Sequence, residues 1–189
     1  MKKAMKIDQL LSILTDCGVH RAAVLPQTSV VYNPVFREIC AKNTCGGYGA
    51  CHMCPPDVGP LDKLMAEAQL YPCCVMYQNV YEIEDSFDYE GMVDAKRFHH
   101  QCAQKIQEAI KPQMSRPFLH LEAGGCGICQ RCARRDDQPC RFPEKALSSL
   151  EAYGIDVYNT AANAGLKYVN GQNTITYFGM IMLTEENDA

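Results

Sequence analysis

The chain has 189 residues, of which 47% are hydrophobic and 21% charged, and its formal net charge is −4. These fractions are typical of a folded protein and argue against disorder, and the length suits a single domain over residues 1–189. No apolar run approaches the roughly 20 residues that cross a bilayer. The acidic balance argues against a nucleic-acid partner, because proteins that bind nucleic acids usually carry a basic excess.

The N-terminal segment predicts the cellular compartment. Its lysines precede an apolar stretch that Asp8 and Asp16 interrupt. A secretory signal needs a continuous apolar core followed by a small-residue cleavage site. We therefore expect a mature start, a cytoplasmic and reducing environment, and no membrane partner.

Helical and strand patterns alternate along the chain. Apolar residues recur on one face of 6–17, where Gly18 ends the helix, whereas 73–83 is rich in β-branched and aromatic residues. In chain order the predicted elements are a helix at 6–17, a strand at 19–25, an irregular loop at 30–60, a helix at 62–71, a strand at 73–83, a helix at 90–114, a strand at 117–122, a second irregular loop at 124–143, a helix at 144–153, and strands at 155–158 and 174–183. We expect an α+β or α/β fold, with a single mixed sheet covered by helices.

Cysteine is the unusual feature of the composition, at 12 of 189 residues. In a reducing compartment thiols stay free, so dense cysteine indicates metal or redox chemistry rather than disulfides. Four cysteines lie within 40–54 and four within 126–140. Both groups fall in predicted loops, which is where a scaffold usually carries function. We expect two cysteine-rich metal-binding loops, at 40–56 and 124–143.

The second group has the spacing of an iron–sulfur loop. Cys126, Cys129 and Cys132 form a Cys-x2-Cys-x2-Cys run, and Cys140 and Pro143 follow it. This is the bacterial ferredoxin type of spacing, which directs three thiolates from one short loop at three corners of a cubane. Seven residues separate Cys132 from Cys140, so the fourth thiolate is either Cys140 or a cysteine of the first group. Zinc is the alternative, although zinc sites usually combine well-separated Cys-x2-Cys pairs.

The first group predicts a second metal loop. Cys40, Cys45, Cys51 and Cys54 have spacings of x4, x5 and x2, interleaved with glycines and followed by Pro-Pro. The Cys-Pro at 54–55 is similar to the end of a ferredoxin half, so each loop could lend one thiolate to the other's cluster. Iron–sulfur is again the first interpretation and zinc the alternative. His52 is expected beside the site rather than among its ligands.

Both segments resemble an uncharacterised family of predicted metal-binding proteins found mainly in anaerobic bacteria and archaea. The early element of that family is represented here by Cys40, Cys45, Tyr48, Gly49, Cys54, Pro55 and Pro56. The late element is represented by Cys126, Cys129, Cys132, Cys140 and Pro143, and then by Ser149, Glu151, Ala152, Gly154, Ile155, Asp156 and Val157. The resemblance covers roughly residues 35–183 and implies metal binding. Position 51 is not reliably cysteine in the family pattern, which leaves the first site three thiolates and an open corner.

The remaining cysteines are predicted to be structural. Cys73 and Cys74 open a strand, so their side chains point to opposite faces of the sheet. Cys17 and Cys102 lie on apolar helix faces, and free cysteine packs there as a small hydrophobic residue.

Charged residues near the second loop allow two interpretations. Its arginines either raise the cluster potential or dock an acidic redox partner, or they belong to a solvated loop balanced by Asp136 and Asp137. They are Arg131, Arg134, Arg135 and Arg141. His99 and His100 are adjacent on a predicted helix and share no face, which predicts a solvated position rather than a paired ligand site.

Three functions are compatible with these patterns. The first is an iron–sulfur protein with two [4Fe–4S] clusters, acting in electron transfer or in reductive activation of a partner in anaerobic metabolism. Its partner would be a redox protein or a metalloenzyme. The second is a zinc-binding structural or interaction module. The third is an enzyme whose open-corner cluster at 40–56 acts on a small substrate.

Overall fold

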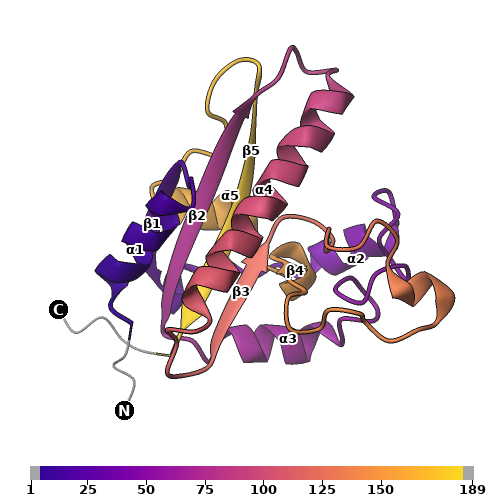
Figure 1. The fold of residues 1–189 in the computed structure, drawn as a ribbon, viewed down its shortest axis with the longest axis horizontal. Coiled ribbons are helices and arrows are strands. Elements are labelled where there is room, and N and C mark those ends of the chain that lie inside the picture. The colour runs from indigo at the N-terminus through magenta and orange to yellow at the C-terminus, as the bar shows by residue number, and fades with distance from the viewer. Residues whose placement is uncertain (1–4, 185–189) are drawn as a thin grey trace.

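The computed structural model describes residues 5–184 and contains a five-stranded sheet with the strand order β1-β2-β5-β3-β4 (Figure 1). The strands are β1 (Arg21–Pro26), β2 (Cys73–Glu82), β3 (Phe118–Glu122), β4 (Ser148–Ser149) and β5 (Thr174–Leu183). The α-helices are α1 (Ile7–Asp16), α2 (Val35–Ala41), α3 (Leu61–Ala68), α4 (Tyr89–Ile110) and α5 (Val157–Asn163). Short 3-10 turns follow at Gln27–Ser29, Ala133–Asp136 and Glu151–Tyr153. The predicted mixed sheet covered by helices is confirmed, in the α+β form.

The sheet is mixed because one edge pair runs parallel. Strand β2 pairs antiparallel with β1 and with β5, and β5 pairs antiparallel with β3. At the other edge β3 and β4 are parallel, with Leu121 opposite Ser148 and Glu122 opposite Ser149. The end of β3 is therefore bonded to a segment far along the chain, and the second cysteine loop lies between these two strands in sequence.

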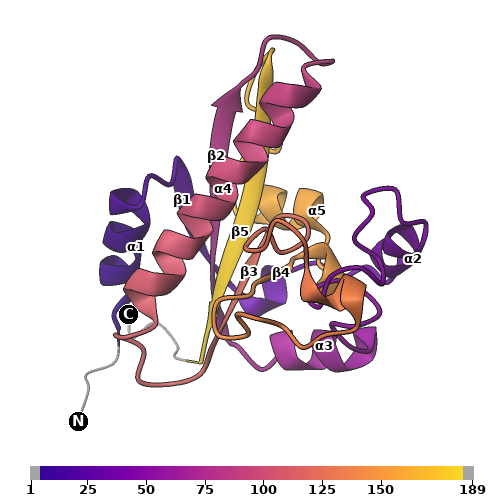
Figure 2. The same cartoon turned by 45° about the vertical axis from the view of Figure 1, so that its right-hand side comes forward.

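Helices α1 and α4 cover one face of the sheet (Figures 1 and 2). Alternate strand residues point to this face, as the pleat requires, and pack against Leu10, Leu14 and Ile106. The strand side chains of this layer are Cys73, Val75, Tyr77, Ile181 and Leu183. Asp88 caps the N-terminus of α4 by accepting a 2.8 Å hydrogen bond from Gly91 N, which fixes where the long helix begins.

Helices α3 and α5 and the turn at 151–153 cover the opposite face. The intervening strand residues pack there, with Cys74, Met76 and Met180 fully buried. Cys73 and Cys74 thus point to opposite faces, as predicted, and both are buried. Cys102 is buried in the α1–α4 layer and Cys17 packs against it, which confirms their structural role. Because both faces are covered, β2 is buried over its first seven residues.

Two predicted elements near the cysteine loops are wrong. The segment 30–60 contains helix α2, so Cys40 lies on a helix rather than in an irregular loop. The predicted helix at 144–153 is instead a turn, the short strand β4 and a 3-10 turn. Pairing of 148–149 with β3 outweighs the local helix propensity there.

The predicted strand at 155–158 is also wrong, for a local reason. Ile155 makes an isolated bridge with Tyr32, and α5 begins at Val157. Asp156 accepts a 3.0 Å hydrogen bond from Asn159 N, so the aspartate acts as a helix N-cap. The β-branched residues around it had favoured a strand, but the cap decides the conformation.

The solvated position predicted for His99 and His100 is wrong as well. His99 is fully buried on the inner face of α4, where it stacks on Tyr77 with ring centroids 5.9 Å apart and makes a tilted contact with Tyr177 at 5.7 Å. His100 is half-buried and hydrogen-bonded to Glu122. Burial lowers the pKa of His99 to about 3.

Within residues 5–184 no helix combines the length and the apolar character needed to span a membrane.

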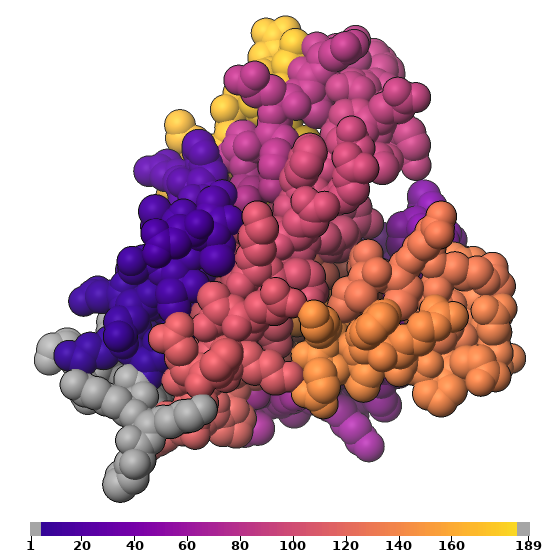
Figure 3. Space-filling view, in the orientation of Figure 1, coloured from indigo at the N-terminus to yellow at the C-terminus, as the bar shows by residue number. Residues whose placement is uncertain are grey.

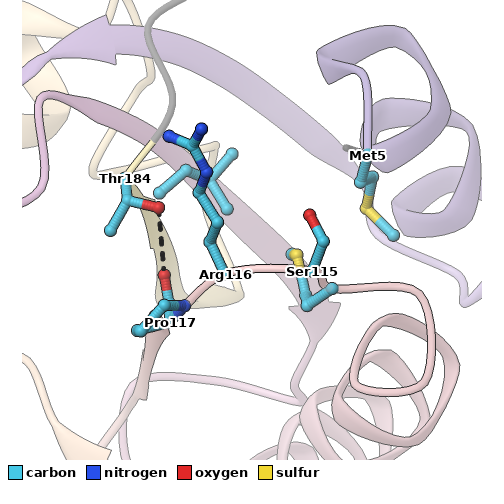
Figure 4. Close-up of a pocket in the computed structure, with 7 residues that line it drawn as sticks. Met5, Ser115, Arg116, Pro117 and Thr184 are labelled. Carbon is cyan, nitrogen blue, oxygen red and sulfur yellow. Dashed lines mark hydrogen bonds between the residues drawn. The ribbon is translucent and has the colours of Figure 1, made fainter. Parts of the chain in front are cut away.

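A small apolar pocket of about 20 Å³ lies where α1 approaches the segment that leads into β3 (Figure 4). It is lined by Met5, Met114 and Pro117, and Thr184 Oγ1 donates a 3.4 Å hydrogen bond to Pro117 O beside it. This pocket contains no cysteine or histidine and lies away from the cysteine loops.

Candidate metal centre

The two cysteine loops lie side by side at one end of the molecule, beyond the edge of the sheet that carries β4 (Figures 1 and 2). We call residues 35–56 and 124–146 together the cysteine lobe. All eight predicted ligand cysteines belong to it, and all twelve cysteines of the chain are free thiols. The fold therefore brings together two sequence segments that are more than 60 residues apart.

Helix α2 positions Cys40 at the start of the first loop. Arg37 anchors this helix, because its Nη2 donates hydrogen bonds to Gly59 O at 3.1 Å and to Ala152 O at 3.0 Å. Cys40 is half-buried, and burial raises the pKa of its thiol. Cys45 is exposed.

Cys51 and Cys54 are the buried sulfurs of the first loop, with exposed fractions of 7% and 9%. The neighbouring Cys54 thiol is the main cause that lowers the pKa of Cys51, and the backbone at Met53 and Cys126 acts in the same direction. The pKa of Cys54 is raised by the same neighbour and by burial. Cys51 belongs to the first loop and lines the pocket of the second, so it lies between them.

Two glycines leave room for the Cys54 sulfur between the loops. A Cβ on Gly47 would lie 3.2 Å from Cys54 Sγ and 3.6 Å from Cys45 Sγ. A Cβ on Gly125, in the second loop, would lie 3.1 Å from the same Cys54 atom. Both distances are tighter than ordinary contacts, so side chains at these positions would push the loops apart.

The second loop forms a cysteine pocket around a small central space. It contains all four predicted ligands of this loop together with Cys51, and His52, Ile128 and Phe142 complete its wall. Those four ligands are Cys126, Cys129, Cys132 and Cys140, each half-buried. The space measures about 20 Å³, close to the volume that one water molecule needs. Burial raises the pKa of Cys126 to about 11.

Polar contacts between the two loops hold the lobe together. Arg134 forms an ion pair with Asp57, and Arg135 Nη2 donates to Gly46 O at 3.1 Å. His52 Nε2 donates to Gln138 O at 2.8 Å. This contact agrees with the prediction that His52 lies beside the thiols. The arginines of the second loop are thus bonded within the lobe, and Arg131 likewise pairs with Asp136 at 2.7 Å.

The eight cysteine thiols of the lobe lie near one another, but they are not arranged around one position that a metal ion could occupy. Among residues 5–184, no group of three or more His, Cys, Asp or Glu side chains has the geometry to hold a metal ion. The eight ligand cysteines therefore stay predictions. Five of them line one pocket, whereas Cys40, Cys45 and Cys54 approach one another outside it, since Cys40 and Cys45 act electrostatically on Cys54.

The cysteine lobe nevertheless offers thiol ligands that suit a metal, and it has little apolar burial of its own to stabilise it. Soft thiolates select zinc, copper(I) and iron–sulfur clusters. Between residues 124 and 143 the one buried side chain is that of Ala133, so apolar burial contributes little there. Segments without a hydrophobic core usually depend on metals or disulfides, and the thiols here are free. The donor set therefore fits a metal or cluster bound by thiolates.

A polar group beside the lobe was missed by sequence reasoning. Glu122 Oε2 lies 2.6 Å from His100 Nδ1, and burial raises the pKa of Glu122. A Cβ on Gly127 would lie 2.8 Å from His100 Cδ2, and one on Gly124 would lie 2.8 Å from Lys96 Nζ. Lys96 and His100 are four residues apart on α4 and therefore share a face, which was a readable signal. The glycines of the loop make room for these two side chains.

Comparison with known proteins identifies the family but gives no further neighbour. Searches of curated proteins and of solved structures each returned no significant match. A family model described as "Predicted metal-binding protein (DUF2284)" matches residues 23–183. This match includes the whole cysteine lobe and all five strands except the first two residues of β1. The chain therefore belongs to the predicted metal-binding protein family DUF2284.

Proposed function

We propose that the chain is an iron–sulfur protein, with two [4Fe–4S] clusters, that transfers electrons to a partner or activates it reductively in the cytoplasm of an anaerobe. The observation that supports this most is the Cys-x2-Cys-x2-Cys run, whose three thiols line one pocket with Cys140 and Cys51. When bound, such clusters supply one-electron redox chemistry at potentials set by charge, hydrogen bonds and exposure.

The chain's own residues would hold and tune the clusters. Cys126, Cys129 and Cys132 would bind the second cluster, and Cys51 or Cys140 would complete its four thiolates. Lys96 and His100, on the far side of the loop, would offset the negative charge of a thiolate-bound cluster. Positive charge and hydrogen-bond donors near a cluster stabilise its reduced, more negative state.

The first loop would hold the other cluster with Cys40, Cys45 and Cys54. If Cys51 belongs to the second pocket, this site has three thiolates, and one iron corner stays open. That arrangement favours the enzyme alternative, in which a small substrate binds at the open corner. If instead Cys51 binds with Cys54, both sites have four thiolates and the function is electron transfer alone.

Zinc is the second candidate metal, and the size of the cysteine pocket favours it. A space of about 20 Å³ suits a single ion better than a cubane, which would require the second loop to be more open. Zinc would stabilise the structure of the lobe, which would then act as an interaction module without redox chemistry.

Metal analysis separates these candidates. The full chain would be purified without oxygen, and its iron, sulfide and zinc contents measured together with a visible spectrum. About eight iron and eight sulfide per chain, with a brown colour bleached by dithionite, would support two cubanes. About four iron would leave one site open or differently filled. One or two zinc ions without colour would overturn the iron–sulfur proposal, because zinc thiolates do not absorb visible light.

A further inference from the structure

A groove on the other side of the second cysteine loop contains none of the predicted metal ligands, although Lys96 and His100 line it. It has a volume of about 710 Å³, within the usual range of small-molecule sites. Helix α4 forms one wall, and Gly127, Ile128 and Lys145 form the other. Helix α4 and the orange second loop face the viewer side by side in Figure 3. Ile128 also lines the cysteine pocket, so one side chain separates the two sites.

The groove combines charged and amide groups with a largely apolar surface. Its four Lys and Arg side chains outnumber its two carboxylates, and each carboxylate already has a partner. The cations are Lys96, Arg97, Lys105 and Lys145, and the carboxylates are Glu108 and Glu122. Glu108 is paired with Lys145 at 2.8 Å, and Glu122 is hydrogen-bonded to His100. Lys96 and His100 are one turn apart and share a face of α4, whereas Lys105 projects from the opposite side of the helix from Lys96. Lys96 forms no ion pair within residues 5–184, so its ammonium group is open to a ligand, and Gln101 and Gln104 add amide groups.

His100 has the orientation of a fixed hydrogen-bonding group at the base of the groove. Its Nδ1 is held by Glu122, whose side chain is 1% exposed, so the ring cannot rotate freely. The ring lies against Gly127, where a Cβ would be only 2.8 Å from Cδ2. Within the described part of the chain its Nε2 makes no hydrogen bond to a protein group, so this atom is left for a ligand or water.

We propose that this groove binds a small molecule bearing a carboxylate or phosphate group, with Lys96 as its charge partner and His100 Nε2 as a hydrogen-bonding group. A charged ligand oxygen between an ammonium group and an imidazole makes charge-assisted hydrogen bonds, which are the stronger kind. The apolar side chains of Val93 and Ile128 would contact the rest of the ligand. The site stands on residues outside the predicted metal ligands, so it does not depend on which metal the lobe holds.

Calorimetric titration of the full chain tests the proposal. Inorganic phosphate and succinate would be titrated separately at constant ionic strength into protein purified without oxygen. We expect saturable binding of at least one of them, and the tighter one identifies the anion class. Loss of one charge-assisted contact corresponds to about tenfold weaker binding, so Lys96→Gln should show about that loss.

Matched controls make the test decisive. Lys63→Gln, at an exposed position of α3, removes the same charge away from the groove and should leave the affinity unchanged. Lys96 touches the cysteine loop and Lys96→Gln could misfold, so Lys96→Arg is a second variant, which keeps the charge and should retain most of the affinity. The His100 ring NMR signals of the unsubstituted chain should shift on saturation. Absence of saturable binding by both anions, or equal affinities in the Lys63→Gln and Lys96→Gln variants, would overturn the proposal. Metal content does not enter this result, so the anion site and the iron–sulfur proposal can fail separately.

Discussion

The sheet and the cysteine lobe are stabilised by different physical means. The first seven residues of β2 are all buried, with helices against both faces of the sheet. In the second cysteine loop Ala133 alone is buried among residues 124–143, and the loops are joined by a few polar contacts and by sulfurs. Apolar burial is the dominant favourable term in folding, so the sheet can be stable without a ligand, whereas we expect the lobe to depend on the metal proposed for it.

The largest expected effect is loss of a metal ligand from the lobe. Cys129→Ser should lose about half of the iron. In hydrogen exchange, the backbone amides of 124–143 should lose their protection, while those of the sheet keep it. Cys102→Ser is the matched control, because Cys102 is buried in the sheet core. It should retain all of the iron. Full iron retention in the Cys129 variant would refute the ligand assignment.

Iron content also separates Cys51 from Cys140 as the fourth ligand of the second site, through the variants Cys51→Ser and Cys140→Ser. If only one of these variants loses iron, the substituted cysteine completes the second site, and the other cysteine is not a ligand. Loss in both would mean that Cys51 serves the first site and Cys140 the second.

A core truncation should produce the opposite pattern. Ile106 is fully buried in the α1–α4 layer, so Ile106→Ala should lower the free energy of unfolding by about 2–5 kcal/mol without changing the iron bound per folded chain. Ile39, on α2 in the lobe, is 48% exposed, and Ile39→Ala should cost no more than about 0.5 kcal/mol. Urea denaturation followed by circular dichroism measures both. Similar losses in the two variants would contradict the proposed division between sheet and lobe.

Gly127→Ala tests the boundary between the two regions. The new methyl group would lie 2.8 Å from His100 Cδ2, and relieving such overpacking costs about 1–3 kcal/mol. Adding His100→Ala to the same chain should recover part of this loss, because the colliding ring is removed. A double-mutant cycle from denaturation curves measures the coupling. Strictly additive losses would show that the glycine has another role.

The last effect concerns pH and belongs to the sheet. Burial lowers the pKa of His99 and of His120 to about 3, whereas an unfolded histidine titrates near about 6.5. Between these values the unfolded chain binds more protons, so acidification should lower the free energy of unfolding by up to about 1.4 kcal/mol per pH unit for each histidine. This stabilisation is complete above about pH 6.5. The raised pKa of Glu122 acts with the opposite sign and reduces the slope.

His99→Phe should make this pH dependence shallower while preserving ring packing between Tyr77 and Tyr177. Urea denaturation at several pH values between 5 and 7 measures the slope for both proteins. Identical slopes would show that His99 does not contribute to the acid sensitivity of the folded state.

Local patterns in the sequence determined most of the sheet and its helices. Helical periodicity predicted α1 and α4, and a β-branched and aromatic run predicted β2, while α3, β1, β3 and β5 were also predicted near their observed positions. These signals are reliable because each element buries one apolar face or, for the central strands, two. The opposite orientations of Cys73 and Cys74 followed from strand geometry alone.

The elements around the lobe followed tertiary contacts or caps instead. Segment 144–153 became a strand and turns because β3 offered backbone partners to Ser148 and Ser149. The Asp156 cap started a helix where a strand was predicted. Helix α2 is held by Arg37 through contacts with Gly59 and Ala152, which no local pattern encodes.

For the candidate site, the spacing of the cysteines by itself indicated metal chemistry and the two loops that carry it. Only the tertiary structure decided that Cys51 and Cys54 lie buried between those loops, and that Lys96, His100 and Glu122 stand behind the second one. Spacing within a loop restricts which thiols can reach one metal, because the chain is short. Contacts between distant segments depend on how the sheet and α4 bring them together, and that is a property of the packed molecule.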